Sequence, residues 1–166
     1  MEQQASNHPA AQDRTAVVRK SDREIVVTRT FDAPPRIVFK AWAEAALFRR
    51  WWVPESAGIT LVACDMDVRT GGTYRLEFAT GETDTMAFYG KYLEVVPDQR
   101  IVWTNDEEGE GAVTTVTFAE RDGKTLLTFH EIYPSKDELD EAMTGSAAGL
   151  PTQFDQLDAL LPTLTE

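Results

Sequence analysis

Residues 135–164 read SKDELDEAMTGSAAGLPTQFDQLDALLPTL, and this stretch decides the fold. Apolar residues recur in it every three or four positions, at Leu139, Met143, Ala147, Leu150, Phe154, Leu157, Leu161 and Leu164. This spacing predicts one apolar stripe along a helix of about eight turns. Ser135, followed three residues later by Glu138, is a capping-box pattern that marks the start of the helix. A helix with one apolar face needs a large apolar surface to lie on, and we expect the rest of the chain to supply it.

The stripe is interrupted by Gly145, Gly149 and Pro151. Because Pro151 has no N–H to offer the carbonyl of Ala147, the sequence predicts a kink or break at Gly149-Leu150-Pro151. Two interpretations stay open. The segment is either two shorter helices that curve over a sheet, or a gate over a cavity with the glycines as its weak point.

The composition is typical of one globular domain with a full core, since the chain has 166 residues, 42% of them hydrophobic and 27% charged. A net charge of −12 argues against nucleic acid and anionic membranes as partners. There is a single cysteine, and neither a signal peptide nor a membrane-spanning window is recognised, so we expect a cytoplasmic protein that does not insert into membranes. Residues 1–21 lack periodicity and are expected to form a disordered leader before one domain at 22–166.

The order of the expected elements indicates an α+β fold. Residues 24–31 alternate between two faces and predict a first strand, after which two short helices extend to about residue 51. Six strands separated by turns then follow, at 59–68, 73–80, 84–96, 100–105, 112–120 and 124–133. Consecutive strands joined by short turns form an antiparallel sheet. We therefore expect about seven strands in a curved sheet wrapped around the C-terminal helix, with either a cavity or a solid core between them.

Several motifs resemble a known superfamily. They are RTFDAP at 29–34, VFKAW at 38–42, WWVP at 51–54, DVRTGGTY at 67–74, GKYLEVVP at 90–97, RIVWT at 100–104 and VTF at 116–118. In this order they resemble the START-like, or SRPBCC, superfamily. Within it they are similar to bacterial relatives (AHSA-type) of the C-terminal domain of the activator of the ninety-kilodalton heat-shock protein ATPase. The resemblance covers about residues 23–162.

The resemblance implies a helix-grip fold, in which a curved antiparallel sheet and a long C-terminal helix enclose a cavity. Members of the superfamily include lipid carriers, hormone receptors, pollen-allergen-like binders, polyketide aromatases and cyclases, and co-chaperone domains, so fold alone does not choose a function. The chain departs from the family pattern at Leu150-Pro151, where relatives usually have glycine followed by tryptophan and a polar residue. This change removes a large aromatic ring from the helix side of the cavity.

The leading hypothesis is non-catalytic binding of a small hydrophobic or aromatic molecule, since a concave apolar pocket with a few polar groups is the usual form of such a site. The residues expected to line it are Trp42, Trp51, Tyr74, Phe88, Tyr92, Trp103, His130, Met143, Leu150 and Phe154. One alternative is docking on a chaperone ATPase, which the resemblance suggests. Another is an enzyme of the cyclase or aromatase kind, in which His130 or Tyr92 positions the substrate; it requires His130 to point inward.

Other candidate groups favour structural interpretations. His130 and Glu131 are neighbours on one strand, so they point to opposite faces and do not form a dyad. Asp65 and Asp67 share a strand face and suggest a metal pair, but no further ligands accompany them, which favours a solvated face. Cys64 has no basic neighbour in the sequence and is expected to pack in the interior. We therefore expect neither a metal nor a cofactor.

Overall fold

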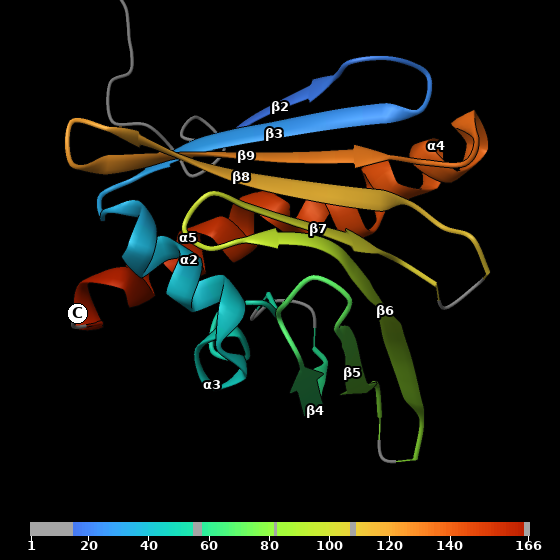
Figure 1. Ribbon diagram of the computed structural model, residues 1–166. Helices are drawn as coiled ribbons and strands as arrows, with labels where there is room; N and C mark the ends of the chain where they lie inside the picture. Colours follow the sequence, from blue (N-terminus) through green and yellow to red (C-terminus); the bar gives the residue numbers. More distant parts are fainter. Residues whose placement is uncertain (1–14, 55–57, 82, 107–108, 165–166) are drawn as a thin grey trace, which may run out of the picture.

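The structure, a computed structural model, describes residues 15–54, 58–81, 83–106 and 109–164. These residues form one eight-stranded antiparallel sheet in the order β2-β3-β9-β8-β7-β6-β5-β4 (Figure 1). The strands are β2 (Ala16–Arg19), β3 (Glu24–Phe31), β4 (Thr60–Met66), β5 (Thr73–Ala79), β6 (Thr85–Val96), β7 (Arg100–Thr104), β8 (Val113–Arg121) and β9 (Lys124–Ile132). Helices α4 (Lys136–Thr144) and α5 (Leu150–Leu160) run across one face of this sheet. The prediction of an α+β helix-grip fold is confirmed.

The eighth strand, β2, was not expected, because residues 16–19 fall inside the segment predicted as a leader. It pairs with β3, with Ala16 opposite Thr28 and Arg19 opposite Ile25. All four of its residues are exposed, so β2 carries no alternation of apolar and polar positions for a sequence pattern to detect. Residues 1–14 of the predicted leader lie outside the described residues.

Two short helices, α2 (Pro35–Ala43) and α3 (Ala45–Phe48), follow β3. Pro35 occupies the first turn of α2, where its missing N–H breaks no helical hydrogen bond. The buried face of α2 packs against β8 and β9. These helices close one end of the concave face of the sheet and carry Trp42 and Phe48 toward the interior.

The C-terminal segment is two helices, as one of the two interpretations predicted, but the break lies further toward the N-terminus than expected. The first helix, α4, begins at the predicted capping box, where the Ser135 hydroxyl accepts a hydrogen bond from the backbone N–H of Glu138. It ends at Gly145, and the 3-10 turn η2 (Ser146–Gly149) leads into α5; a second 3-10 turn, η3 (Leu161–Thr163), follows α5. Pro151 lies in the first turn of α5, so it starts that helix instead of breaking it.

A buried arginine holds α5 against the sheet. Arg29 on β3 is 3% exposed. Its Nη1 donates to Asp155 Oδ1 at 2.7 Å, and its Nη2 donates to Asp158 Oδ2 at 3.1 Å. Positions three apart share one face of a helix, so both carboxylates of α5 reach the same guanidinium. A buried charge is tolerated only when it is paired, and these two ion pairs therefore set how α5 is rotated over the sheet.

The sheet turns at β6, which serves both of its halves. This strand pairs with β5 from Thr85 to Lys91 and with β7 from Tyr92 to Val96, with a register shift between Tyr92 and Glu94. Gly90 is required just before the shift, because a Cβ there would lie 2.0 Å from the Thr104 carbonyl oxygen. Figure 1 shows β5 and the lower part of β6 turning away from β8 and β9. The turn gives the sheet the concave face on which the helices lie.

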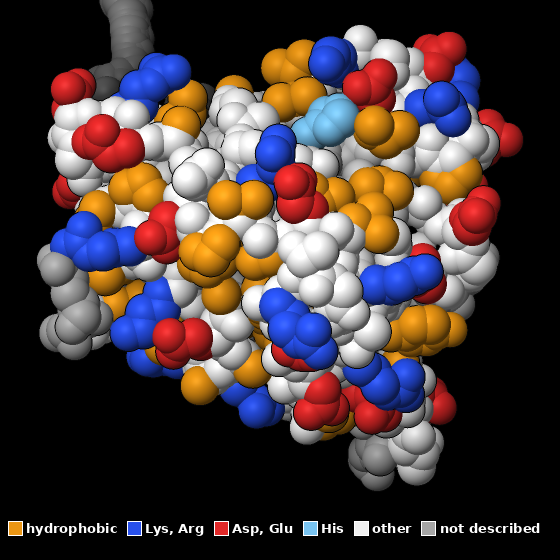
Figure 2. All heavy atoms as spheres, viewed as in Figure 1, with side chains coloured by type: hydrophobic (Ala, Val, Ile, Leu, Met, Phe, Trp, Pro, Cys, Tyr) orange, Lys and Arg blue, Asp and Glu red, His pale blue; other side chains and the backbone are white. Residues whose placement is uncertain are grey.

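The face seen in Figure 2 mixes hydrophobic side chains with acidic and basic ones, without a gathering of one charge. Among the described residues no helix is long and apolar enough to cross a membrane.

Candidate ligand cavity

A cavity of about 760 Å³ lies between the concave face of the sheet and the C-terminal helices. Strands β4, β5, β6, β7 and β9 line one side of it, α4, η2 and α5 line the other, and the segment after α3 adds Trp52, Val53 and Pro54. The sheet and the helices are therefore not packed into a solid core. A volume of this size is within the range of sites for small molecules, about 300–1,000 Å³.

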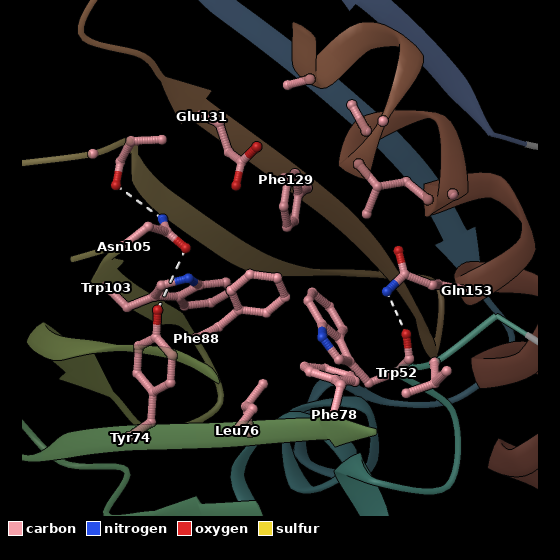
Figure 3. Close-up of a pocket in the computed structure, with 18 of the residues that line it drawn as sticks. Trp52, Tyr74, Leu76, Phe78, Phe88, Trp103, Asn105, Phe129, Glu131 and Gln153 are labelled. Atoms are coloured by element: carbon pink, nitrogen blue, oxygen red, sulfur yellow. Dashed lines mark hydrogen bonds between the residues drawn. The ribbon is translucent and has the colours of Figure 1, made fainter. Parts of the chain in front are cut away.

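Aromatic rings make up much of the wall. Figure 3 shows Trp52, Phe78, Phe88, Trp103 and Phe129 converging on the middle of the cavity. The rings support one another, since Phe78 and Phe88 lie 5.4 Å apart and Trp103 and Phe129 lie 6.3 Å apart between ring centres. Trp52 also stacks on Phe48, at 4.8 Å. Such walls present both the faces and the edges of rings, which suit an apolar or aromatic occupant.

Six of the ten residues predicted to line the cavity do so: Trp42, Tyr74, Phe88, Tyr92, Trp103 and Leu150. Their binding of a ligand remains a prediction.

For Trp51, Phe154 and Met143 the predicted place in the lining is wrong. Trp51 is fully buried, and its indole N–H donates to the Ala41 carbonyl at 3.0 Å. Phe154 is also fully buried, edge-on to Phe31 at 5.7 Å, in the core under β3. Met143 packs against the edge of that core from α4. Trp51 and Phe154 therefore fill the core beside the cavity, and Met143 covers the edge of that core.

His130 lies on the opposite face of the sheet, so its predicted place in the cavity is also wrong. Its neighbours Phe129 and Glu131 line the cavity, and strand alternation turns His130 away from it. The His130 Nε2 atom lies 2.9 Å from Glu24 Oε1 on β3. The cyclase hypothesis needed an inward His130, and this support is lost.

One end of the cavity carries a hydrogen-bonded polar group (Figure 3). Asn105 Nδ2 donates to the Ala112 carbonyl at 2.9 Å and to Thr114 Oγ1 at 3.1 Å. The Thr114 hydroxyl donates to Glu131 Oε2 at 2.6 Å, and the Tyr133 hydroxyl donates to Glu131 Oε1. Both carboxylate oxygens of Glu131 therefore act as acceptors.

Gln153 forms the other polar end, reaching in from α5 (Figure 3). It is 7% exposed, and its Nε2 donates to the carbonyl of Trp52. Gln156, one turn away, donates to the carbonyls of Trp51 and Val53 at 2.9 and 2.8 Å. These amides fix the segment after α3 to α5 and so hold Trp52 in the wall.

Tyr92 is a buried phenol in the wall, and burial raises its pKa well above its ordinary value. The hydroxyl therefore stays protonated at neutral pH. Tyr92 is suited to hydrogen bonding with an occupant and not to accepting a proton from one.

The candidate metal and thiol groups lie outside the cavity lining. Asp67 is paired with Arg69, whose Nε lies 2.9 Å from Asp67 Oδ2, and Asp65 is exposed. The described residues contain no group of three or more His, Cys, Asp or Glu side chains that could hold a metal ion. Cys64 is half-buried, and burial raises the pKa of its thiol, which fits the expected packing role.

Neither Glu131 nor Gln153 was predicted as a cavity residue, although the sequence held a signal for both. Glu131 has the same strand parity as Leu127 and Phe129, which are apolar and buried. Gln153 is a polar residue next to Phe154 within the apolar face of α5. For Asn105, at the end of β7, the sequence gives no comparable signal.

Comparison with known proteins yields one family and a set of similar structures. The family described as Activator of Hsp90 ATPase homolog 1-like protein matches residues 32–162. No curated protein matches the chain.

Three of the similar solved structures illustrate the range. A protein from Chromobacterium violaceum is 30% identical over 83% of this chain and 96% of its own, with a TM-score of 0.71. A protein from Rhodobacter sphaeroides has a TM-score of 0.82 at 20% identity, covering 91% of this chain and 99% of its own. An AHSA1-like protein from Aeromonas hydrophila has a TM-score of 0.68 at 18% identity, covering 84% and 92%. At identities below 25% the likeness shows a shared fold and nothing finer.

Proposed function

This chain belongs to the activator of Hsp90 ATPase homolog 1-like family, and from that premise we propose that it binds a small hydrophobic or aromatic molecule in its internal cavity without transforming it. The observation that carries the proposal is the cavity of about 760 Å³ with its aromatic walls. Burying apolar ligand surface there contributes about 25 cal/mol per Å². The rings of Trp52, Trp103 and Phe129 already stand around the cavity, so binding requires little further ordering of side chains.

The polar groups of the cavity support a role in orientation. Tyr92 stays protonated because burial raises its pKa, and both oxygens of Glu131 already accept hydroxyl protons. Gln153 is held by the Trp52 carbonyl. A few fixed polar groups in an apolar cavity select the orientation of an occupant, which is the usual arrangement in binding sites.

The test uses a cavity-filling variant and a matched control. Ala142 lines the cavity from α4, and Ala119 is exposed on β8. Ala142→Trp is expected to weaken binding of the neutral fluorescent probe 1-pyrenemethanol at least tenfold, whereas Ala119→Trp leaves it unchanged. At 100 times the dissociation constant the probe should stabilise the wild type by about 2.7 kcal/mol, a rise in Tm of about 5–10 °C. Absence of binding, or equal binding by Ala142→Trp, would refute the proposal.

The family name favours a second candidate, association with a chaperone ATPase of the Hsp90 type. A titration of the chaperone with this chain, following both binding and the rate of ATP hydrolysis, tests it. Saturable binding that Ala142→Trp leaves intact would support a docking role separate from the cavity. No binding at tens of micromolar would end this candidate.

A further inference from the structure

The charged side chains that line the cavity are all acidic. They are Glu131 on β9 and Glu138 and Glu141 on α4. No lysine, arginine or histidine is among the described lining residues. A ligand anion placed there would lose its hydration without gaining a positive partner, which is costly in an apolar surrounding.

The hydrogen bonds at the polar end run in one direction, toward Glu131. The Ala112 carbonyl can only accept, so it fixes the amide nitrogen of Asn105 on its side. That nitrogen also donates to Thr114 Oγ1, and the Thr114 hydroxyl in turn donates to Glu131 Oε2. The Tyr133 hydroxyl supplies the second donor. Two hydroxyl donors on one carboxyl group are the pattern that stabilises the ionised form.

The rest of the cavity is complementary to a donor or a cation. Gln153 uses its nitrogen on the Trp52 carbonyl, so its oxygen is the group left to meet an occupant. Phe129 lies next to Glu131 on the same face of β9, and aromatic faces attract cations. Neutral donors also lie in the wall, among them the Tyr92 phenol and the buried Trp42 N–H, which has no hydrogen-bond partner in the described part of the chain. They can meet a neutral acceptor on the occupant, but they carry no positive charge to pair with an anion.

We infer that the cavity selects an aromatic molecule carrying a protonated amine, with the amine beside Glu131 and the rings between Trp52, Trp103 and Phe129. This inference rests on the proposed function and adds the chemical class of the ligand. The carboxylate analogue of the same ring system is rejected.

Three probes with one ring system separate charge from shape: 1-pyrenemethylamine, 1-pyrenemethanol and 1-pyrenecarboxylate. Fluorescence titrations at pH 7 and physiological ionic strength limit the long-range effect of the net charge of −12. The amine is expected to bind at least tenfold more tightly than the carboxylate, with the alcohol between them. Equal or tighter binding of the carboxylate would overturn the inference.

A charge-neutral variant locates the preference. Glu131→Gln should lower the ratio of amine to carboxylate affinity at least fivefold, with the affinity for the alcohol changed less than threefold. Glu77→Gln, on the outer face of β5, makes the same change in net charge and should leave the ratio within twofold. Should Glu131→Gln fail to fold, the pair Glu138→Gln and Glu141→Gln, exposed on α4, should lower the ratio instead. An unchanged ratio in the folded variants would overturn the inference.

Binding of 1-pyrenemethanol separates the proposed function, ligand binding in the cavity, from the inferred preference for a protonated amine. If 1-pyrenemethanol binds and Ala142→Trp weakens it, but amine and carboxylate bind equally, only the charge inference fails. If the alcohol does not bind to the wild type, the proposed function fails and the inference fails with it.

Discussion

Removing Arg29 is expected to destabilise the fold less than removing the two carboxylates that it pairs with. The Arg29 side chain is 1% exposed, whereas those of Asp155 and Asp158 are 39% and 29% exposed. In an Arg29→Met variant the aspartates can be rehydrated, and the new side chain fills the apolar space. In an Asp155→Ala and Asp158→Ala double variant, the guanidinium stays buried without a carboxylate.

The exposure of these side chains sets the expected difference in unfolding free energy between Arg29→Met and the double aspartate variant. Hydrogen bonds to charged groups contribute about 1.5–3 kcal/mol each, and the partial exposure of both aspartates reduces the loss for Arg29→Met to about 1–2 kcal/mol in total. Leaving a buried charge unpaired costs about 3–5 kcal/mol, so the double variant should be the less stable by about 2 kcal/mol. Arg29 Nε already lacks a hydrogen-bond partner among the described residues, so replacing the arginine removes an unsatisfied buried donor and the loss of stability is reduced further.

Urea unfolding of the three proteins, analysed by linear extrapolation, measures these differences. Asp140→Ala is the matched control, because Asp140 pairs with Arg19 at the same 2.7 Å but on the surface, and its loss should have little effect. The reasoning is refuted if Arg29→Met is as destabilising as the double aspartate variant, or more so.

Three further predictions concern single residues. Gly90→Ala should lower the free energy of unfolding by about 2–3 kcal/mol, since its Cβ would meet the Thr104 carbonyl oxygen. A loss below about 0.5 kcal/mol in urea unfolding would contradict this. The hydrogen bond with His130 lowers the pKa of Glu24 below its ordinary value of 4.5, so its stabilising effect is complete above that pH and is lost as the pH falls through the folded value. Urea unfolding between pH 3 and pH 6 should therefore show the wild type and Glu24→Gln converging at the acidic end. Because burial raises the pKa of Cys64, its thiol should react with iodoacetamide at pH 8 more slowly in the folded protein than in urea, and equal rates would argue against burial.

The alternation of residues along strands predicted much of the sheet side of the cavity. The bounds of β3 agree with the pattern at residues 24–31, and Tyr74, placed on one face with Leu76 and Phe78, lines the cavity with both of them. Alternation also predicted that the side chains of His130 and Glu131 lie on opposite faces of the sheet. It did not say which of the two faces inward, because that depends on which side of the sheet the helices cover.

The helix side was harder to predict, because an apolar stripe does not fix the rotation of a helix against its partner. Phe154 and Gln153 are neighbours on α5, and the stripe favoured Phe154 as the cavity residue. The ion pairs of Arg29 set the rotation, which places Phe154 in the core and Gln153 in the cavity. The break at Gly145, in place of the expected one at Pro151, follows from the tolerance of a proline in the first turn of a helix.

The most direct test of ligand binding in the cavity uses the indole N–H signals of the four tryptophans in a two-dimensional ¹H–¹⁵N NMR spectrum. Trp52 and Trp103 line the cavity, whereas Trp51 is fully buried in the core with its N–H bonded to a backbone carbonyl. On titration with 1-pyrenemethanol, the signals of Trp52 and Trp103 should shift strongly and saturably while that of Trp51 moves little. Uniformly small, non-saturating shifts of all four signals would contradict the account.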